Sequence, residues 1–205
     1  MLPSIFTQLL KNHNSDESLI KQLWSEVEKH YTSKGRYYHT LLHLQNMYTQ
    51  LLAVKEQIVD WDTLLFSLIY HDIIYRTTRK DNEERSAVLA EKRLVQISYP
   101  QEKTRLCVQQ ILATKSHTFS IDSDANYFTD ADLSILGADW PEYEQYTKAI
   151  RKEYSIYPDL LYKTGRSKVL QHFSAMQRIY KTEYFYYLYE VKAKENINKE
   201  LAYLL

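Results

Sequence analysis

The sequence predicts an all-α protein, folded as a single-domain helical bundle. Only three glycines and four prolines occur among 205 residues, and both residue types interrupt helices. Apolar residues recur at helical spacing along most of the chain, whereas no segment shows the alternation of a strand. A length of 205 residues is typical of one domain. We therefore expect one domain over residues 1–205.

The first helices can be placed from their caps and apolar stripes. Ser15 precedes a helix that is expected to end near Tyr31. A second helix is expected over about 38–55 and a third over about 60–75, where Asp60 suits the first turn. The third is apolar along nearly its whole length, so we expect it to be buried on most sides.

The later helices follow from similar signals. Two are expected over about 82–98 and 100–115. Residues 116–130 are rich in Ser, Asp and Asn and are expected to be irregular. Asp139 begins a capping-box-like segment with a proline in the first turn, which predicts a helix to about Tyr154. Two further helices complete the chain.

Composition excludes several classes of partner. Lys and Arg number 26 and Asp and Glu number 26, so the formal net charge is zero. Nucleic-acid polymers and anionic membranes normally require a basic face, so neither is expected as a partner. The most apolar stretch, residues 64–75, is too short to span a bilayer. With one cysteine, Cys107, and no basic leader at its amino end, the protein is expected in the cytoplasm.

A histidine and an aspartate, His71 and Asp72, are adjacent inside the most apolar segment. Burying both without compensation would be costly. A divalent metal is an economical partner, because neutral imidazole and carboxylate are its usual ligands. The alternative is an ordinary hydrogen-bonded His-Asp pair.

Two further groups favour a metal. His39 and His43 stand at i and i+4, which would place them on the same face of one helix. The alternative is a pair of exposed or half-buried histidines. Asp130 and Asp132 stand at i and i+2 where a helix is expected to begin. Their alternative role is that of a helix N-cap.

The order of these residues resembles the H…HD…D pattern of the HD superfamily of metal-dependent phosphohydrolases. The segment from Tyr38 to His43 is similar to the Y-H-x-x-x-H segment of the cyclic-nucleotide phosphodiesterases, and Ala131–Ser134 is similar to their A-D-L-S segment. The chain looks most like a small family of predicted HD phosphohydrolases of about this length, over about residues 36–180.

The resemblance implies a fold and a set of roles. It implies an HD-type helical bundle with its metal-site core in about residues 36–137 and C-terminal helices, 140–205, packing on it. The implied metal ligands are His43, His71, Asp72 and Asp132. Asp72 would bridge to a second ion and so share in catalysis, and His39 corresponds to the general acid. The cofactor would be one or two divalent ions, of Mn, Fe, Co, Ni, Zn or Mg.

Five other residues are weaker candidates for the second shell or for phosphate binding. They are Glu83, His117, Asp130, Arg36 and Arg85. Glu83 would orient a ligand or a water, and the arginines would clamp phosphate. Their alternative roles are structural: a cap carboxylate, a helix-terminal histidine and surface ion pairs.

The expected function is therefore hydrolysis of a phosphoester of a small molecule, a nucleotide among the candidates, through a metal-activated water. The alternative is a non-catalytic metal-containing sensor that binds a phosphorylated ligand. A di-iron oxygenase would need more histidines between the HD pair and the last aspartate, where only His117 is available. The Tyr-rich C-terminal helix, 180–189, is a candidate contact for a homo-oligomer.

Overall fold

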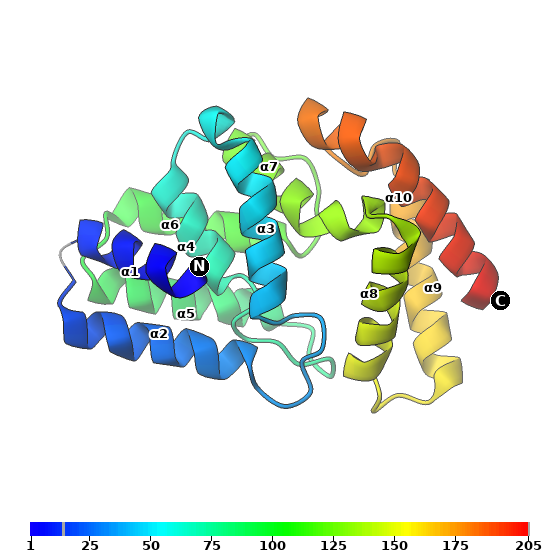
Figure 1. The fold of residues 1–205 in the computed structure, drawn as a ribbon, viewed down its shortest axis with the longest axis horizontal. Helices are drawn as coiled ribbons and strands as arrows, with labels where there is room; N and C mark the ends of the chain where they lie inside the picture. The colour runs from blue at the N-terminus through cyan, green and yellow to red at the C-terminus, as the bar shows by residue number, and fades with distance from the viewer. Residues whose placement is uncertain (14, 205) are drawn as a thin grey trace. The chain divides into compact units, whose positions relative to one another are not determined.

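The structure is a computed structural model that describes residues 1–13 and 15–204. Ten α-helices and two 3-10 helices form the secondary structure of these described residues, which contain no strand. The predicted all-α class is therefore confirmed. Contacts divide the chain into two compact units, Met1–Thr129 and Asp130–Leu205, and the boundary falls inside one helix (Figure 1).

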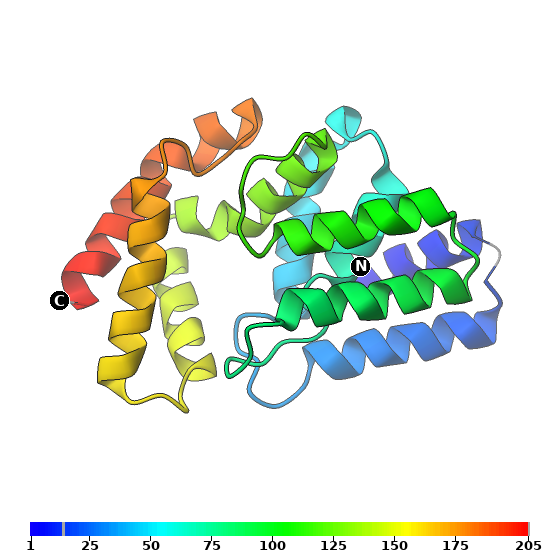
Figure 2. The same cartoon turned by 180° about the vertical axis from the view of Figure 1, so that it is seen from behind.

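The first unit is built around one buried helix. Its elements are α1 (Leu2–Asn12), α2 (Glu17–Tyr31), α3 (Leu41–Ala53), η1 (Lys55–Gln57), α4 (Trp61–Tyr70), α5 (Asn82–Gln96), α6 (Gln101–Ala113) and most of α7 (Ser123–Asp132). Every residue of α4 from Thr63 to Tyr70 is buried, as its apolar sequence predicted. Helices α3, α5 and α6 all contact α4, and Figure 2 shows α5 and α6 side by side.

The segment expected to be irregular, 116–130, is mostly helical from Ser123 onward. The carboxylate of Asp122 accepts the Asp124 N–H at 3.0 Å and thereby begins α7. Along the helix, Ala125 and Phe128 are buried. The prediction was wrong here because a composition rich in Ser, Asp and Asn resembles a loop, whereas burial of one face makes the segment a helix. Helix α1 was not predicted either.

The second unit consists of η2 (Leu133–Gly137), α8 (Trp140–Glu153), α9 (Asp159–Ala175) and α10 (Glu183–Leu204). A buried ion pair joins α9 to α10, because the Arg166 guanidinium donates to both carboxylate oxygens of Glu200, at 2.8 and 3.0 Å. Tyr143 of α8 donates its hydroxyl to the same carboxylate at 2.5 Å. These paired charges fix the three helices against one another.

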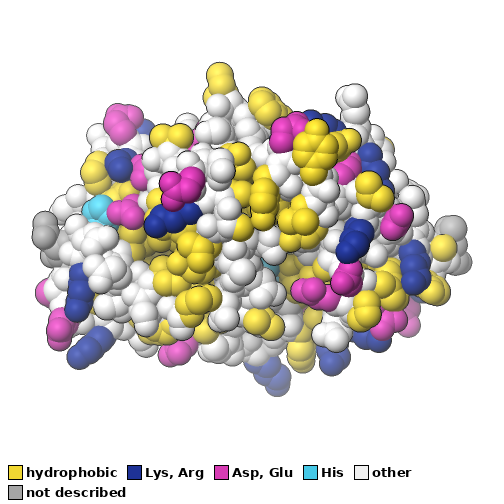
Figure 3. Space-filling model, turned by 45° about the horizontal axis from the view of Figure 1, so that its top comes forward, with side chains coloured by type: hydrophobic (Ala, Val, Ile, Leu, Met, Phe, Trp, Pro, Cys, Tyr) yellow, Lys and Arg dark blue, Asp and Glu magenta, His cyan; other side chains and the backbone are white. Residues whose placement is uncertain are grey.

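The surface carries mixed charge. In Figure 3 acidic and basic side chains are interspersed over the face shown, in keeping with the zero net charge. Helix α10 presents four exposed apolar side chains at helical spacing: Tyr184, Tyr187, Leu188 and Val191. A homo-oligomer through this helix stays a prediction. No helix within the described residues is long and apolar enough to cross a bilayer.

Candidate metal centre

His71 and Asp72 lie at the end of α4 and not inside a helix, so the prediction that the helix continues to residue 75 was wrong. His71 is the C-cap of α4. The chain then turns: the Ile73 N–H donates to the Tyr70 carbonyl, and the Ile74 N–H donates to the Ser86 hydroxyl of α5. These bonds replace those of a further helical turn. The His-Asp pair therefore lies at the end of a buried helix.

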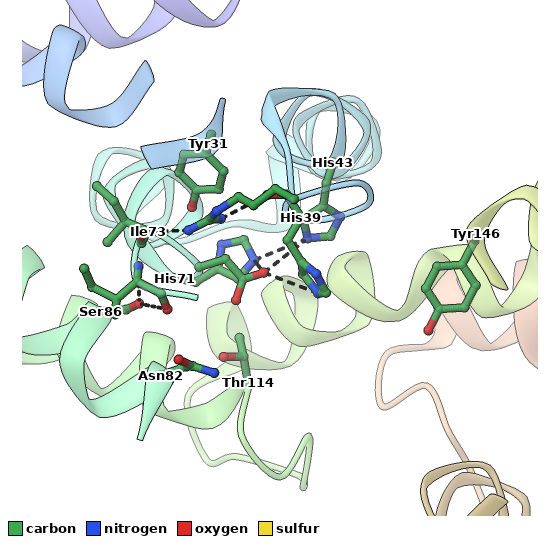
Figure 4. A network of polar contacts seen from close by, with 12 residues as sticks. Tyr31, His39, His43, His71, Ile73, Asn82, Ser86, Thr114 and Tyr146 are labelled. Carbon is green, nitrogen blue, oxygen red and sulfur yellow. Dashed lines mark hydrogen bonds and ion pairs between the residues drawn. The ribbon is translucent and has the colours of Figure 1, made fainter. Parts of the chain in front are cut away.

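His39 and His43 do not share a helix, contrary to the prediction. Thr40 is the N-cap of α3, and its hydroxyl accepts the Leu42 N–H at 3.3 Å. His39 therefore precedes the helix, whereas His43 lies in its first turn. The two side chains nevertheless converge on Asp72. The Nε2 atom of each lies 3.9 Å from the Asp72 Oδ2 atom (Figure 4).

The hydrogen bonding of His71 indicates which of its ring nitrogens could bind a metal. Its Nδ1 atom lies 2.9 Å from the Leu68 carbonyl oxygen and donates to it. In a neutral imidazole, Nε2 then carries a lone pair. This Nε2 lies 3.4 Å from Nε2 of His43 and 3.2 Å from Oδ2 of Asp72. Three potential ligand atoms thus face one small volume.

Asp132, the last residue of α7, completes a group that could hold a metal ion. His43, His71 and Asp132 each offer one ligand atom, and these atoms lie within 4.8 Å of one another. Both histidines are buried, and Asp132 is partly exposed. The ligands come from the start of α3, the end of α4 and the end of α7.

The spacing and chemistry of these donors fit a divalent metal. Two imidazole nitrogens that bind one tetrahedral ion at about 2.0–2.1 Å are about 3.3 Å apart, close to the 3.4 Å between His43 and His71. An N–H···N hydrogen bond between the rings is the alternative, with His43 Nε2 protonated. Imidazole and carboxylate together suit Mn, Fe, Co, Ni or Zn.

The neighbouring histidines favour the charged form of Asp72. Burial alone would raise the pKa of its carboxyl, but His71, His39 and His43 together hold that pKa well below its usual range. The neighbouring Glu83 at the start of α5 differs: burial raises its pKa, and the negative charge of Asp72 adds to the shift. Glu83 therefore lies within the electrostatic field of the centre.

Arg36 holds the two histidine segments together. Its guanidinium donates to the carbonyl of His39 at 3.0 Å and to that of Ile73 at 2.9 Å. It also lies over the rings of Tyr31 and Tyr75, at 4.8 and 5.6 Å. These bonds position the segments on either side of the metal centre, and the predicted role of Arg36 as a phosphate clamp stays a prediction.

Tyr75 is a residue of the centre that the sequence did not indicate. Its ring stacks on His39, with centroids 4.0 Å apart and planes at 30°. Tyr75 follows the His-Asp pair by three residues, and no spacing rule separates it from the other 18 tyrosines. Only the turn after α4 brings it to His39.

Asp130 has a structural role inside the second unit. Its carboxylate accepts from the backbone N–H groups of Lys181 and Thr182, from the Lys181 ammonium and from the Thr182 hydroxyl, at 2.8–3.0 Å. These bonds occupy both oxygens. Asp130, the weaker alternative ligand, therefore does not join the metal group.

His117 and Arg85 also lie in structural settings. His117 ends the segment after α6 with φ 51°, and its N–H donates to the Ala113 carbonyl at 3.0 Å. It is not in the metal group found among the described residues. Arg85 is exposed and pairs with Asp81 at 2.7 Å. Their predicted roles in phosphate or metal binding stay predictions.

Comparisons of the chain with protein-family models, with curated proteins and with solved structures found no match. The HD resemblance therefore stays a prediction from the sequence.

Proposed function

We propose that this centre binds a divalent transition metal and that the protein is a metal-dependent phosphohydrolase. The substrate would be a small phosphoester, with a nucleotide as one candidate. The observation that carries the proposal is the convergence of two imidazole nitrogens, 3.4 Å apart, with carboxylates beside them. Such a metal and an adjacent acid can act together on a phosphoryl group, and the resemblance to the HD phosphohydrolases favours that substrate class.

Two kinds of residue serve different parts of the chemistry. His43, His71 and Asp132 would hold one ion, and Asp72 would bind it as well or bridge to a second. A divalent ion bound there would lower the pKa of a water and polarise the phosphoryl oxygen. His39 lies outside the metal group, 3.9 Å from Asp72. The Asp72 carboxylate can stabilise a protonated His39, the form that gives a proton to a leaving oxygen.

Side-chain exposure supports this division of roles. The side chains of His43 and His71 are only 2% and 1% exposed. Those of His39 and Asp72 are 18% and 16% exposed. A substrate would therefore reach the proton donor and the bridging carboxylate from solvent, while the imidazole ligands stay dry and rigid.

The first test is the metal content of three purified proteins: wild type, His71→Ala and His172→Ala. His172 is an exposed histidine on α9 and controls for the loss of an imidazole. We expect near-stoichiometric transition metal in wild type and His172→Ala and little in His71→Ala. Wild-type protein that stays metal-free after titration with Mn, Co and Zn would contradict the proposal.

The second test is turnover of p-nitrophenyl phosphate and bis(p-nitrophenyl) phosphate. We expect His39→Ala to retain its metal and to lose about 100-fold or more in rate, as removal of a general acid does. Equal metal but no turnover of any phosphoester by wild type would instead favour a sensor that only binds a phosphorylated ligand.

A further inference from the structure

A cavity in the first unit is lined by none of the candidate metal ligands. It is an open cavity of about 990 Å³ between the C-terminal half of α2 and the segment Ile74–Arg79 that follows the His-Asp pair. Its walls are strongly basic. The cationic lining residues are Lys29, Arg36, Arg76, Arg79 and Arg85, and the one acidic residue in the described lining is Glu26.

This positive charge is concentrated by the fold, since the whole chain has no net charge. Glu26 does not neutralise the cavity cations, because both of its oxygens accept from Arg93, at 2.6 and 2.7 Å. Arg93 is itself outside the lining. Arg79 and Arg85 share a single carboxylate, that of Asp81. The single negative charge of Asp81 therefore neutralises these two guanidinium groups only in part.

The other three cations have no carboxylate partner among the described residues. Lys29 and Arg76 make no side-chain ion pair within residues 1–13 and 15–204. Arg36 donates only to two neutral carbonyls, and its buried Nε–H has no hydrogen-bond partner in the described structure. Each charge therefore adds to the positive potential of the cavity.

We propose that this cavity is a binding site for a small polyanion that carries two or more phosphate groups. Guanidinium forks match phosphate oxygens in geometry as well as in charge. The volume is in the range of cavities that enclose small molecules. A single monoanion would leave most of the three unpaired and two half-paired cations uncompensated, so a diphosphate or longer polyphosphate is the better fit.

The cavity shares a wall with the metal centre. Arg36 and Tyr75 both line the cavity. Both residues also contact His39: Arg36 donates a hydrogen bond to the His39 carbonyl, and Tyr75 stacks on the His39 ring. A polyanion in the cavity would therefore act on His39 and not directly on the metal ligands. The binding claim itself does not depend on the proposed phosphohydrolase activity.

The test is titration calorimetry of the full-length protein with inorganic pyrophosphate. The double variant K29Q/R76Q removes the two cations whose side chains make no ion pair. The matched control, K11Q/K21Q, removes two exposed lysines from α1 and α2 that do not line the cavity. His71→Ala shows whether pyrophosphate binds at the metal centre instead, and citrate replaces phosphate by carboxylate.

We expect saturable 1:1 binding of pyrophosphate by wild type, K11Q/K21Q and His71→Ala alike. Binding by K29Q/R76Q should be weaker by about tenfold or more, as loss of hydrogen bonds to charged groups implies. Three results would overturn the proposal: no pyrophosphate binding by wild type, equal binding by K29Q/R76Q, or binding abolished by His71→Ala alone. Tighter binding of citrate than of pyrophosphate would overturn the assignment to phosphates.

Discussion

The carboxylate of Asp130 is completely buried and accepts hydrogen bonds at both oxygens from residues 181 and 182. In Asp130→Asn the amide NH2 would face backbone N–H groups and the Lys181 ammonium. A buried hydrogen-bond donor would then face other donors with no acceptor between them, and the ion pair with Lys181 would be lost. We expect the free energy of unfolding to fall by about 2–4 kcal/mol, as measured by urea denaturation.

The matched control is Asp139→Asn, the same change at an exposed ion pair with Lys192. Surface pairs contribute little, so its unfolding free energy should stay within about 0.5 kcal/mol of wild type. Metal content should be normal in any folded Asp130→Asn protein. Loss of metal from a variant of wild-type stability would mean that Asp130, and not Asp132, is the ligand.

The identities of the candidate ligands could be predicted from the sequence, but their convergence could not. His43, His71 and Asp132 were predicted as ligands, and the structure brings their ligand atoms within 4.8 Å. His39 was predicted to reach the centre through helical spacing from His43. It reaches Asp72 from a turn instead, because the Thr40 cap begins the helix after it. Such an approach depends on tertiary contacts, including that with Tyr75.

At the scale of elements, η2 packs so closely on α10 that there is no room for a methyl group at Gly137. A Cβ added at Gly137 would lie 2.5 Å from the Tyr189 Cβ atom and 2.7 Å from its carbonyl oxygen. Gly137→Ala must therefore displace backbone, and we expect it to lower the unfolding free energy by about 2 kcal/mol or more. Thermal or urea unfolding measures the loss.

The same substitution at Gly165, inside α9, should have the opposite sign. A Cβ there meets no atom of the described residues within 4 Å. Alanine is the better helix former, so Gly165→Ala should raise the unfolding free energy by about 0.5–1 kcal/mol. Equal destabilisation by both variants would show that the close contact between Gly137 and Tyr189 does not cause the loss of stability.

Helices α2 and α5 are joined by a charge pair with a definite pH dependence. Arg93 donates to both oxygens of Glu26, and this bonding lowers the pKa of Glu26 despite partial burial. A carboxyl with a lowered folded-state pKa stabilises the fold above its unfolded pKa and loses that contribution as the pH falls through the folded value. Glu26→Gln should therefore destabilise by about 1–2 kcal/mol near neutral pH.

The difference between wild type and Glu26→Gln should shrink as the pH is lowered below the ordinary pKa of a glutamate and vanish in stronger acid. Urea denaturation at a series of pH values measures it. Glu102→Gln is a suitable control, because Glu102 forms only an exposed pair with Arg105. A constant difference at all pH values would mean that packing, and not the charge of Glu26, is responsible.

Most helices could be predicted to within a few residues, because caps and apolar stripes are local signals. Thus α2, predicted to end near Tyr31, does end there. The failure at α7 has a different cause. Many of its residues are poor helix formers, and burial of Ala125 and Phe128 stabilises the helix. Phe128 packs on the distant His71, with ring centroids 5.6 Å apart. The early end of α4 is likewise fixed by Ser86 of α5, whose hydroxyl accepts the Ile74 N–H from twelve residues further along the chain.

At the scale of the whole molecule, the metal ligands are far apart in the chain. His43 and Asp132 lie in α3 and α7 and His71 caps the end of α4, so only the folded chain brings the three together. An ion that binds this group binds the native state and not the unfolded chain, so it should stabilise the protein in proportion to its affinity. At a metal concentration about 100-fold above Kd the gain is about 2.7 kcal/mol.

Removal of the metal should therefore lower the melting temperature of the wild type by about 5–10 °C, given the usual entropy of unfolding at this size. Differential scanning calorimetry with and without a chelator measures the shift. His71→Ala should melt at the same temperature with and without the chelator. It lacks one of the three ligands and should therefore bind no ion at this centre. A chelator effect of the same size in His71→Ala would place the stabilising ion elsewhere and would separate metal binding from the His43–His71–Asp132 centre.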